Sequence, residues 1–350
     1  MKTVKVCASK AYEVKIGSTL LASLGAEAAA VTKVGTAAII SDSNVWPMYG
    51  EVAKKSLESA GFSVISYVFA AGESSKNAET YISVLNFLAQ NRINRGDCLI
   101  ALGGGVVGDL TGFVAATYLR GIAYIQVPTT LLAAVDSSVG GKTAIDLDCG
   151  KNLVGAFYQP KLVLCDTDTL NTLPQDIFRD GCAEVIKYGI LYDESLFAQL
   201  ENSGLDFDRE SVIARCVEWK RDVVAKDEFD TGSRMKLNLG HTIGHGVEAG
   251  SHYTVSHGKA VAIGTAIISR GAVKYGICTQ NTCNRIQRVL AQFGLPVSTD
   301  CKVQTLFDAA LSDKKRSGGI VNLIVPEKIG SCIIRPTPVA EVKAWIEAGL

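Results

Sequence analysis

All four histidines of the chain lie between positions 241 and 257. His241 and His245 are four residues apart, which places them on one face of a helix, and His257 opens the next helical segment. Neutral imidazole is the commonest protein ligand for metal ions, and catalytic zinc sites use three protein ligands and one open position. We therefore expect two of these three histidines to bind a metal, although the spacing does not say which two. His252 lies in a polar stretch and is expected at the surface.

A third ligand must come from elsewhere in the chain, and Glu184 is the best candidate. It stands in the apolar run Cys182–Gly189, where a charged carboxylate needs a partner. The alternative for the histidine pair is an ordinary helix with two hydrogen-bonded imidazoles. The confinement of every histidine to one short segment, with Arg234 and Asn238 nearby in the sequence, favours the metal site.

Glycines cluster directly after an apolar run, in the segment Ala101–Asp109 (ALGGGVVGD). Glycine lets the backbone approach a ligand closely, and the helical run 110–119 that follows offers free N–H groups to an anion. The spacing differs from the GxGxxG fingerprint, and a tight turn without a ligand is the alternative. The position after a strand favours phosphate or pyrophosphate binding. The polar segment Gly72–Lys76, also after a strand, either adds contacts or is a solvated loop.

Several cations stand among glycines or other small residues, as in VGGKT around Lys142 and CGKNLVGAF around Lys151. For any one of them, the simpler interpretation is a solvent-facing side chain. A cation in a closely packed loop needs an anionic partner, however, and a phosphate or carboxylate substrate would supply it. With the histidines and glycines, this pattern indicates a nucleotide-dependent metalloenzyme with an anionic substrate. The cations are Arg120, Lys142, Lys151, Lys187, Lys220, Arg234, Lys314 and Lys315.

The composition excludes several other classes of protein. Lysine plus arginine and aspartate plus glutamate both number 35, so the chain lacks the basic excess of nucleic-acid-binding proteins. With 47% hydrophobic and 20% charged residues, it is expected to fold compactly. The uncharged run 121–135 is interrupted by polar residues and proline, which argues against a membrane span. Ten cysteines without a CxxC pair, and a start (MKTVKVCASKAYEVK) without an apolar signal region, predict reduced thiols and a cytoplasmic enzyme.

Short apolar runs alternate with helical patterns through the first half of the chain. This alternation predicts a parallel sheet covered by helices on both faces. After Thr169–Pro174 helical periodicity dominates, with one short hairpin near the end. We therefore predict an α/β domain over residues 1–175 and a mainly helical domain over residues 176–350. The predicted strands are 36–41, 62–69, 98–102, 124–127, 162–165, 320–325 and 331–335, and the predicted helices are 45–60, 79–91, 110–119, 184–192, 210–226, 241–249, 257–275 and 281–293.

Six motifs follow one another along the chain: Gly103–Phe113 (GGGVVGDLTGF), Gln126–Leu132 (QVPTTLL), Asp136–Lys142 (DSSVGGK), Gly150–Asn152 (GKN), Ala183–Tyr188 (AEVIKY) and Leu237–His245 (LNLGHTIGH). In this order and at these separations they resemble the 3-dehydroquinate synthase family, a branch of the sugar phosphate cyclases. The likeness runs from about Asp42 to Gly330. It implies a Rossmann-like N-terminal domain, a helical C-terminal domain and a homodimer.

The resemblance also implies an activity. Members of this family convert 3-deoxy-D-arabino-heptulosonate 7-phosphate into 3-dehydroquinate and phosphate, in the shikimate route to aromatic amino acids. They are phosphorus–oxygen lyases that use NAD and a divalent metal, zinc or cobalt. NAD removes a hydride, phosphate leaves by elimination, the same nicotinamide returns the hydride, and an intramolecular aldol step closes the carbocycle. The partner implied is a sugar phosphate, without nucleic acid or membrane.

The family's roles can be carried over residue by residue. By resemblance, Glu184, His241 and His257 are the metal ligands, His245 handles a proton or contacts phosphate, and Arg120 reaches a neighbouring subunit's site. The substrate set corresponds to Asp136, Asn152, Lys187, Lys220, Arg234, Asn238 and Lys314. The NAD set corresponds to Asp42, Asn44, Gly72, Glu73, Ser74, Ser75, Lys76, Gly105, Val106, Val107, Gly108, Asp109, Thr129 and Thr130. Lys142, Lys151, Thr169, Leu170, Asn171 and Thr172 belong to the nucleotide set or to its border with the substrate.

Two positions depart from the family pattern. Lys259 stands where the family usually has an acidic residue, and Ala71 stands where many relatives have a polar one. Among rivals, 2-deoxy-scyllo-inosose synthase and epi-valiolone synthases share the NAD and metal apparatus, but Asn238 and His245 match the 3-dehydroquinate synthase form. A metal-dependent polyol dehydrogenase would release NADH, and a non-catalytic relative would not be expected to keep intact ligands and cations.

Overall fold

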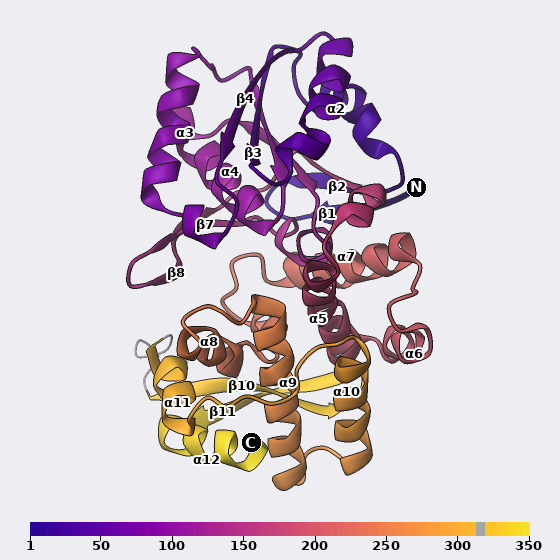
Figure 1. The fold of residues 1–350 in the computed structure, drawn as a ribbon, viewed down its shortest axis with the longest axis vertical. Helices are drawn as coiled ribbons and strands as arrows, with labels where there is room; N and C mark the ends of the chain where they lie inside the picture. The colour runs from indigo at the N-terminus through magenta and orange to yellow at the C-terminus, as the bar shows by residue number, and fades with distance from the viewer. Residues whose placement is uncertain (313–318) are drawn as a thin grey trace. The chain divides into compact units, whose positions relative to one another are not determined.

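The structure, a computed structural model, describes residues 1–312 and 319–350 and divides by its internal contacts into two units (Figure 1). The first unit comprises Met1–Leu173 with Arg209–Phe229, and the second comprises Pro174–Asp208 with Asp230–Leu350. The domain boundary predicted at residue 175 lies next to the first point at which the chain passes from one unit to the other, between Leu173 and Pro174. Helix α7 (Arg209–Lys226), which the prediction assigned to the second domain, belongs to the first unit because it packs against strands β1 and β2.

A seven-stranded sheet is the centre of the first unit, in the order β1-β2-β9-β6-β5-β3-β4. All neighbouring strands are parallel except β1, which pairs antiparallel with β2. The five strands predicted in this half are confirmed, whereas the β1–β2 hairpin was not predicted. The strands are β1 (Lys2–Cys7), β2 (Ala11–Gly17), β3 (Thr36–Asp42), β4 (Ser63–Phe69), β5 (Cys98–Gly103), β6 (Ala123–Pro128) and β9 (Leu162–Asp166).

Helices cover both faces of this sheet, as the alternation of strands and helices predicts. Ile39 and Ile100 belong to a core cluster with α1 (Leu24–Val31) and α2 (Trp46–Ser59). Their chain neighbours Ile40 and Leu99 point to the other face, where they pack with α3 (Ala78–Gln90) and α4 (Gly105–Thr117). Figure 1 shows α2 and α3 on opposite sides of β3 and β4. Successive strand residues alternate between faces, so each apolar run serves two cores.

The carboxyl edge of the sheet contains a topological switch point. From β3 the chain adds β4 on one side and then returns to add β5 on the other. Parallel α/β sheets bind their ligands outside the carboxyl ends of the strands at such a reversal. Asp42 is the last residue of β3, and the glycine-rich turn follows β5, so the topology places two predicted NAD segments at this edge of the sheet.

Two local predictions in this unit were wrong. Lys142 and Lys151 were expected in loops, but they lie on a two-stranded antiparallel hairpin of β7 (Lys142–Leu147) and β8 (Gly150–Phe157). Helix α4 begins at Gly105 rather than at residue 110. The glycines hid this first turn, yet Val107 is fully buried against the sheet and anchors it.

Helices dominate the second unit, and its two-stranded antiparallel hairpin confirms the predicted pair of C-terminal strands. The hairpin packs against α5, α9 and α12. Helix α5 begins nine residues before the predicted start, because Pro174 directly precedes its first turn and Asp176 lies within that turn. The elements are α5 (Gln175–Tyr192), α6 (Glu194–Ser203), α8 (His241–Gly250), α9 (His257–Lys274), α10 (Gln280–Gln292), α11 (Val303–Ser312), β10 (Ile320–Lys328), β11 (Ser331–Pro338) and α12 (Val339–Gly349).

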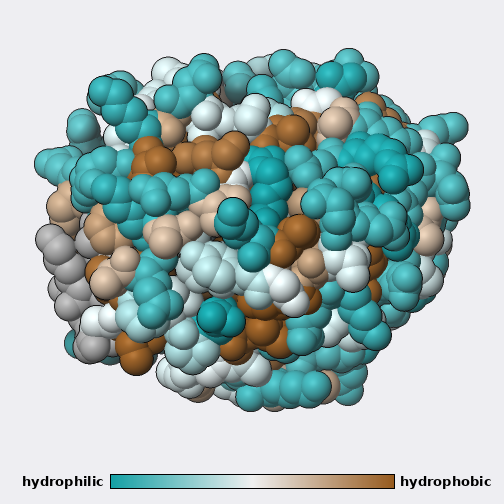
Figure 2. Space-filling view, turned by 90° about the horizontal axis from the view of Figure 1, so that it is seen from below, coloured by the Kyte–Doolittle hydropathy of each residue, from teal (hydrophilic) through white to brown (hydrophobic). Residues whose placement is uncertain are grey.

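The surface is mixed in character. On the face drawn in Figure 2, hydrophilic residues separate several small hydrophobic patches. Within the described ranges, no helix combines the length and the apolar character needed to cross a membrane.

Candidate active site

Three helices of the second unit bring the predicted metal ligands together. Glu184 lies in the middle of α5 and is completely buried. His241 is the first residue of α8, directly after Gly240, whose φ of 79° is left-handed. A Cβ atom at Gly240 would lie 2.4 Å from Thr265 Oγ1, so only glycine lets α8 start this close to α9. His257 is the first residue of α9.

The two imidazoles point the same ring atom towards one carboxylate oxygen. His241 Nε2 lies 3.7 Å and His257 Nε2 3.5 Å from Glu184 Oε1. Ligand atoms of the three residues all lie within 4.8 Å of one another, which makes them the one group of potential metal ligands found in the described part of the chain. Two imidazole nitrogens and a carboxylate oxygen converging in this way suit a zinc-type site with an open fourth position.

Burial and neighbouring charges give the two imidazoles opposite titration behaviour. Burial, assisted by the Lys187 ammonium, lowers the pKa of His241 to about 3. Burial alone would also lower the pKa of His257, but Glu184 and Glu248 outweigh it and raise that pKa to about 10. The Lys187 ammonium forms an ion pair with Glu184 Oε2. A divalent ion would therefore displace a proton from His257 and take over part of the charge balance of Glu184.

The third histidine of the cluster lies near this group but outside it. The ring of His245 is exposed, and its centroid lies 5.7 Å from that of His241 and 6.5 Å from that of His257. Helix α8 therefore presents His241 and His245 on neighbouring turns, as the spacing of four predicts. His252 is exposed, as expected. The open choice among three histidines is thus narrowed by geometry to His241 and His257.

Other predicted substrate residues of the second unit are buried cations or lie close to α8. Arg234 and Lys187 are each 2% exposed. Asn238 ends the short 3₁₀ segment Ser233–Asn238 just before His241. Lys314 lies outside the described residues.

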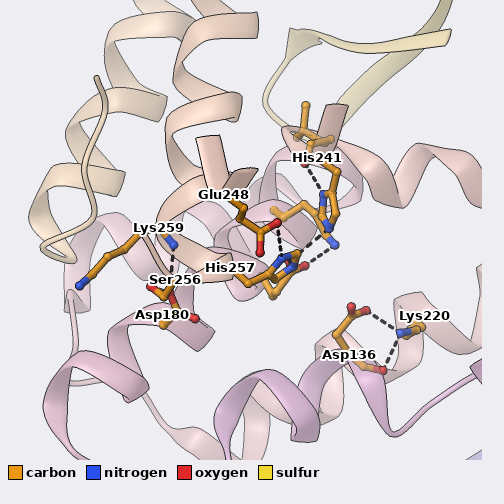
Figure 3. Close-up of polar contacts among 11 residues, drawn as sticks. Asp136, Asp180, Lys220, His241, Glu248, Ser256, His257 and Lys259 are labelled. Carbon is orange, nitrogen blue, oxygen red and sulfur yellow. Dashed lines mark hydrogen bonds and ion pairs between the residues drawn. The ribbon is translucent and has the colours of Figure 1, made fainter. Parts of the chain in front are cut away.

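In the first unit, Lys220 on α7 holds Asp136. Its Nζ donates to Asp136 Oδ1 at 2.6 Å and to the Asp136 carbonyl oxygen at 2.5 Å (Figure 3). Asp136 belongs to a π-helical turn, Ala133–Ser137. The predicted pair of substrate residues therefore forms one ion-paired group, and this contact adds to the packing of α7 against β1 and β2.

Lys76 is the centre of a second polar network in the first unit. It is 4% exposed, and its Nζ lies 2.7 Å from Asp109 Oδ2, 2.5 Å from Asn152 Oδ1 and 3.8 Å from Glu73 Oε1. Lys151 joins the network through Glu73 at 3.9 Å. Burial raises the pKa of Asp109 although Lys76 opposes this, and the Asp109 charge in turn raises the pKa of Lys76 against its own burial. One buried ammonium thus joins segment 72–76, helix α4 and strand β8.

The start of α4 has no side-chain cap and is closely packed by the segments around it. The first N–H groups of a helix have no partner inside the helix, and Gly104 has no side chain with which to cap them. A Cβ atom at Gly104 would lie 3.0 Å from Thr130 Cγ2, and one at Gly108 would lie 2.5 Å from Gln126 Oε1. Thr129 N donates to the Gly103 carbonyl. The turn after β5 and the segment after β6 therefore pack closely around an N-terminus that fits a pyrophosphate.

Other predicted NAD residues also lie at the carboxyl edge of the sheet, after β3 and β9. Asp42 Oδ1 accepts hydrogen bonds from the N–H groups of Asn44 and Val45, and Ala71 N donates to Ser43 Oγ. Ala71, one of the two positions that depart from the family pattern, makes this contact through its backbone alone. The contact therefore does not depend on the side chain at position 71.

The 3₁₀ segment Thr167–Thr172 is held by side chains from two other helices. Tyr49 Oη on α2 donates to the Thr169 carbonyl oxygen and hydrogen-bonds with Thr172 Oγ1, and Arg209 on α7 donates to Asn171 Oδ1. Leu170 of this segment is buried.

Two carboxylates around the metal group were not predicted from the sequence. Glu248 Oε2 lies 3.5 Å from His257 Nδ1, and Asp180 Oδ1 accepts hydrogen bonds from Ser256 Oγ and from the N–H of Lys259. Lys259, the other position that departs from the family pattern, therefore makes its contact with Asp180 through its backbone N–H. Glu248 follows His241 by seven residues, two helical turns, and this spacing was the signal that could have identified it.

Comparisons with known families agree with this architecture. Two family models match the chain, 3-dehydroquinate synthase N-terminal over residues 66–180 and 3-dehydroquinate synthase C-terminal over residues 181–316. A 3-dehydroquinate synthase of Clostridium acetobutylicum is 41% identical over 353 residues, covering 99% of each chain.

Solved structures are similar over nearly the whole chain. A 2-deoxy-scyllo-inosose synthase complexed with carbaglucose-6-phosphate, NAD⁺ and Co²⁺ superposes with a TM-score of 0.89 at 26% identity, covering 100% of both chains. A 2-epi-5-epi-valiolone synthase of Streptomyces hygroscopicus subsp. jinggangensis, with NAD⁺ and Zn²⁺ bound, also has a TM-score of 0.89, at 28% identity over 98% of both chains.

Replacing Lys76 tests the network in the first unit. In Lys76→Met the half-buried Asp109 carboxylate loses its buried cation, and we expect the free energy of unfolding at pH 7 to fall by about 2–4 kcal/mol. The loss of the cation raises the Asp109 pKa further, so the deficit relative to wild type should grow as pH rises from 4 to 7. Because the Lys76 pKa is itself raised, the stabilisation from its charge is fully present below its ordinary value of 10.5 and is lost only as pH rises beyond that value, through the raised pKa. Urea denaturation across this pH range measures the effect.

The matched control is Lys54→Met. Lys54 is 40% exposed in its side chain and pairs with Glu58 at 4.0 Å, so its replacement should change stability by less than about 1 kcal/mol. A deficit in Lys76→Met that is the same at pH 4 and pH 7 would contradict the assigned pairing with Asp109.

Proposed function

The chain belongs to the 3-dehydroquinate synthase family, and from this premise we propose which of its residues carry the reaction. The reaction converts 3-deoxy-D-arabino-heptulosonate 7-phosphate into 3-dehydroquinate and phosphate, a lyase step of the shikimate pathway. The observation that carries the site assignment is the convergence of two imidazole Nε2 atoms on the buried carboxylate of Glu184. NAD and a divalent metal, bound by the sugar phosphate cyclases of similar structure, are its cofactors.

The proposed metal ligands are Glu184, His241 and His257. When bound there, a divalent ion supplies Lewis-acid polarisation of the substrate hydroxyl that is oxidised. Glu184 contributes the negative charge that retains the ion in a buried position, and its ion pair with Lys187 keeps that charge compensated before the ion binds. Because the imidazoles must be neutral to bind, His257 gives up its proton on loading.

The proposed NAD site is the carboxyl edge of the sheet. NAD supplies a hydride acceptor that is restored within each turnover. The first N–H groups of helix α4 would hold the pyrophosphate, with Gly105, Val106 and Val107 contributing backbone only. Gly108 and Asp109 on the same helix, Asp42 and Asn44, the segment 72–76, Thr129, Thr130 and residues 169–172 complete the set that we infer from the family.

The proposed substrate contacts are cations, which suit a phosphate and a carboxylate. Arg234 and Lys187 are buried, and a buried cation binds an anion more strongly than a solvated one does. Lys220 donates two hydrogen bonds to Asp136 and so orients this residue before the substrate binds. His245, exposed beside the metal group, is assigned to proton handling or a phosphate contact. Asn152, Asn238 and Lys314 complete this set, and Lys142 and Lys151 lie in the nucleotide set or at its border with the substrate.

Assembly and location follow from the family as proposals. We propose a homodimer in which Arg120 reaches the partner's substrate. Leu119, Arg120 and Gly121 have φ values of 49°, 66° and 118°, so Arg120 stands on a tightly bent and exposed turn, which suits a residue that contacts another molecule. Free cysteines and a biosynthetic role support the cytoplasm as the compartment.

The principal rivals are less well supported. The other sugar phosphate cyclases of similar structure are 26% and 28% identical to this chain, whereas the 3-dehydroquinate synthase of C. acetobutylicum is 41% identical. A polyol dehydrogenase would leave NADH as product, while the cyclase reaction has no net redox change. A phosphate-release assay with the heptulosonate phosphate separates these activities.

We expect phosphate release that requires NAD and metal, stops with chelator and leaves no stoichiometric NADH. Absorbance near 340 nm follows NADH while released phosphate is measured in the same sample. Accumulation of one NADH per substrate consumed would identify a dehydrogenase and refute the proposed reaction. Failure to release phosphate with zinc, NAD and substrate supplied would indicate a non-catalytic relative.

Replacing His257 tests the metal assignment. His257→Ala should lose bound metal and phosphate release together, because two ligands bind a divalent ion far more weakly than three. Metal content after dialysis, measured by atomic emission, provides the readout. His252→Ala, in the exposed loop before α9, is the control and should keep both properties. Full metal occupancy in His257→Ala would exclude this ligand.

Replacing Arg234 tests the substrate assignment. Arg234→Ala should weaken substrate binding about 10- to 100-fold, the range expected for losing a charged hydrogen-bonded contact. NAD binding, measured by calorimetry, should stay unchanged and also report an intact first unit. Arg285→Ala, which removes the pairing with Glu201 in the same unit, should leave both affinities unchanged. A comparable loss of NAD affinity in Arg234→Ala would place this arginine on the cofactor side.

A further inference from the structure

The imidazole of His257 faces a carboxylate at each of its nitrogens. Nε2 lies 3.5 Å from Glu184 Oε1, in the proposed metal group. Nδ1 lies 3.5 Å from Glu248 Oε2, on the other side of the ring (Figure 3). Glu248 lies on the last turns of α8, and its side chain is 5% exposed. A carboxylate buried to this extent needs a hydrogen-bonded or charged partner, and the His257 ring supplies one.

The second imidazole of the group has the same arrangement with a neutral acceptor. His241 Nδ1 lies 3.0 Å from the Leu239 carbonyl oxygen, while its Nε2 faces Glu184. In both histidines an acceptor at Nδ1 fixes the ring so that Nε2 points to the metal position. Such an acceptor also selects the tautomer with hydrogen on Nδ1, which leaves the Nε2 lone pair for a metal.

The position of the His257 backbone does not depend on Glu248. Asp180 on α5 accepts hydrogen bonds from Ser256 Oγ at 2.5 Å and from the Lys259 N–H at 2.9 Å, so it caps α9 (Figure 3). A Cβ atom at Gly258 would lie 2.0 Å from the Asp180 carbonyl oxygen, which shows how closely α9 approaches α5. Asp180 therefore fixes the helix end, and Glu248 acts on the rotation of the ring.

We propose that Glu248 is a positioning residue for the metal site. It accepts the Nδ1 hydrogen of His257, orients the ring towards the position shared with Glu184 and His241, and increases the electron density at Nε2. The inference rests on the proposed function, because it concerns the metal that function requires. Outer-shell partners of this kind typically change metal affinity by about 10- to 100-fold.

The test compares two replacements of Glu248 by metal affinity. Glu248→Gln keeps an oxygen acceptor but loses the charge, and Glu248→Ala loses both. We expect zinc affinity, measured by competition with a chromophoric chelator, to fall by about 10-fold in the first and about 100-fold in the second. The visible absorption bands of the Co²⁺-loaded protein should shift in both variants, since they report the ligand field rather than stability.

The matched control is Glu201→Gln, which makes the same change in the same unit on a carboxylate paired with Arg285. It should leave zinc affinity and the Co²⁺ spectrum unchanged. Metal-free melting curves show whether each variant is folded, and the isosteric Glu248→Gln carries the test if Glu248→Ala does not fold. Wild-type zinc affinity and an unshifted spectrum in Glu248→Gln, with binding lost in His257→Ala, would overturn this inference alone. Absence of zinc binding in the wild-type protein would overturn the proposed function as well.

Discussion

A completely buried carboxylate, Glu184, determines how the second unit is built. A charge in that position is tolerated only with compensation, and three sources converge on it, the ammonium of Lys187 and the imidazoles of His241 and His257. Lys187 lies on α5 with Glu184, whereas His241 begins α8 and His257 begins α9. The three helices must therefore pack closely and in fixed positions for these groups to reach the carboxylate. Glycines at the contacts, Gly240 and Gly258, permit that approach. The charge compensation of Glu184 therefore depends on the close packing of these helices, and the same glycines make both possible.

The first unit meets a different requirement of the proposed function, which is to bind the pyrophosphate of NAD through backbone N–H groups. Its sheet reverses strand order between β3 and β5, and helix α4 starts at that crevice without a side-chain cap. The buried Lys76 joins this region to strand β8 through Asp109 and Asn152. The residues inferred for cofactor and substrate are thus linked inside one unit by a single ammonium.

Much of the fold could be predicted because its signals are local. The apolar runs around Ile39 and Ile100 indicate strands by length and composition, and their alternation with helices indicates a parallel sheet. The hairpin β7–β8 was missed because its glycines and lysines resemble loop sequence, and its strands are defined mainly by pairing with each other. The placement of α7 was missed because the contacts of Lys220 with Asp136 join residues far apart in the sequence.

The sequence alone determined the residue types and their local spacing, and these identified His241, His245, His257 and Glu184 as a candidate metal set. A pattern of types cannot say which ring nitrogens converge, since that depends on the angles at which separate helices cross. The resemblance to the family named His241 and His257 rather than His245, and the tertiary structure brings these two imidazoles together with Glu184. Only the tertiary structure placed Glu248 beside His257. Helical periodicity is encoded within a few residues, whereas the meeting of three helices depends on packing across the whole unit.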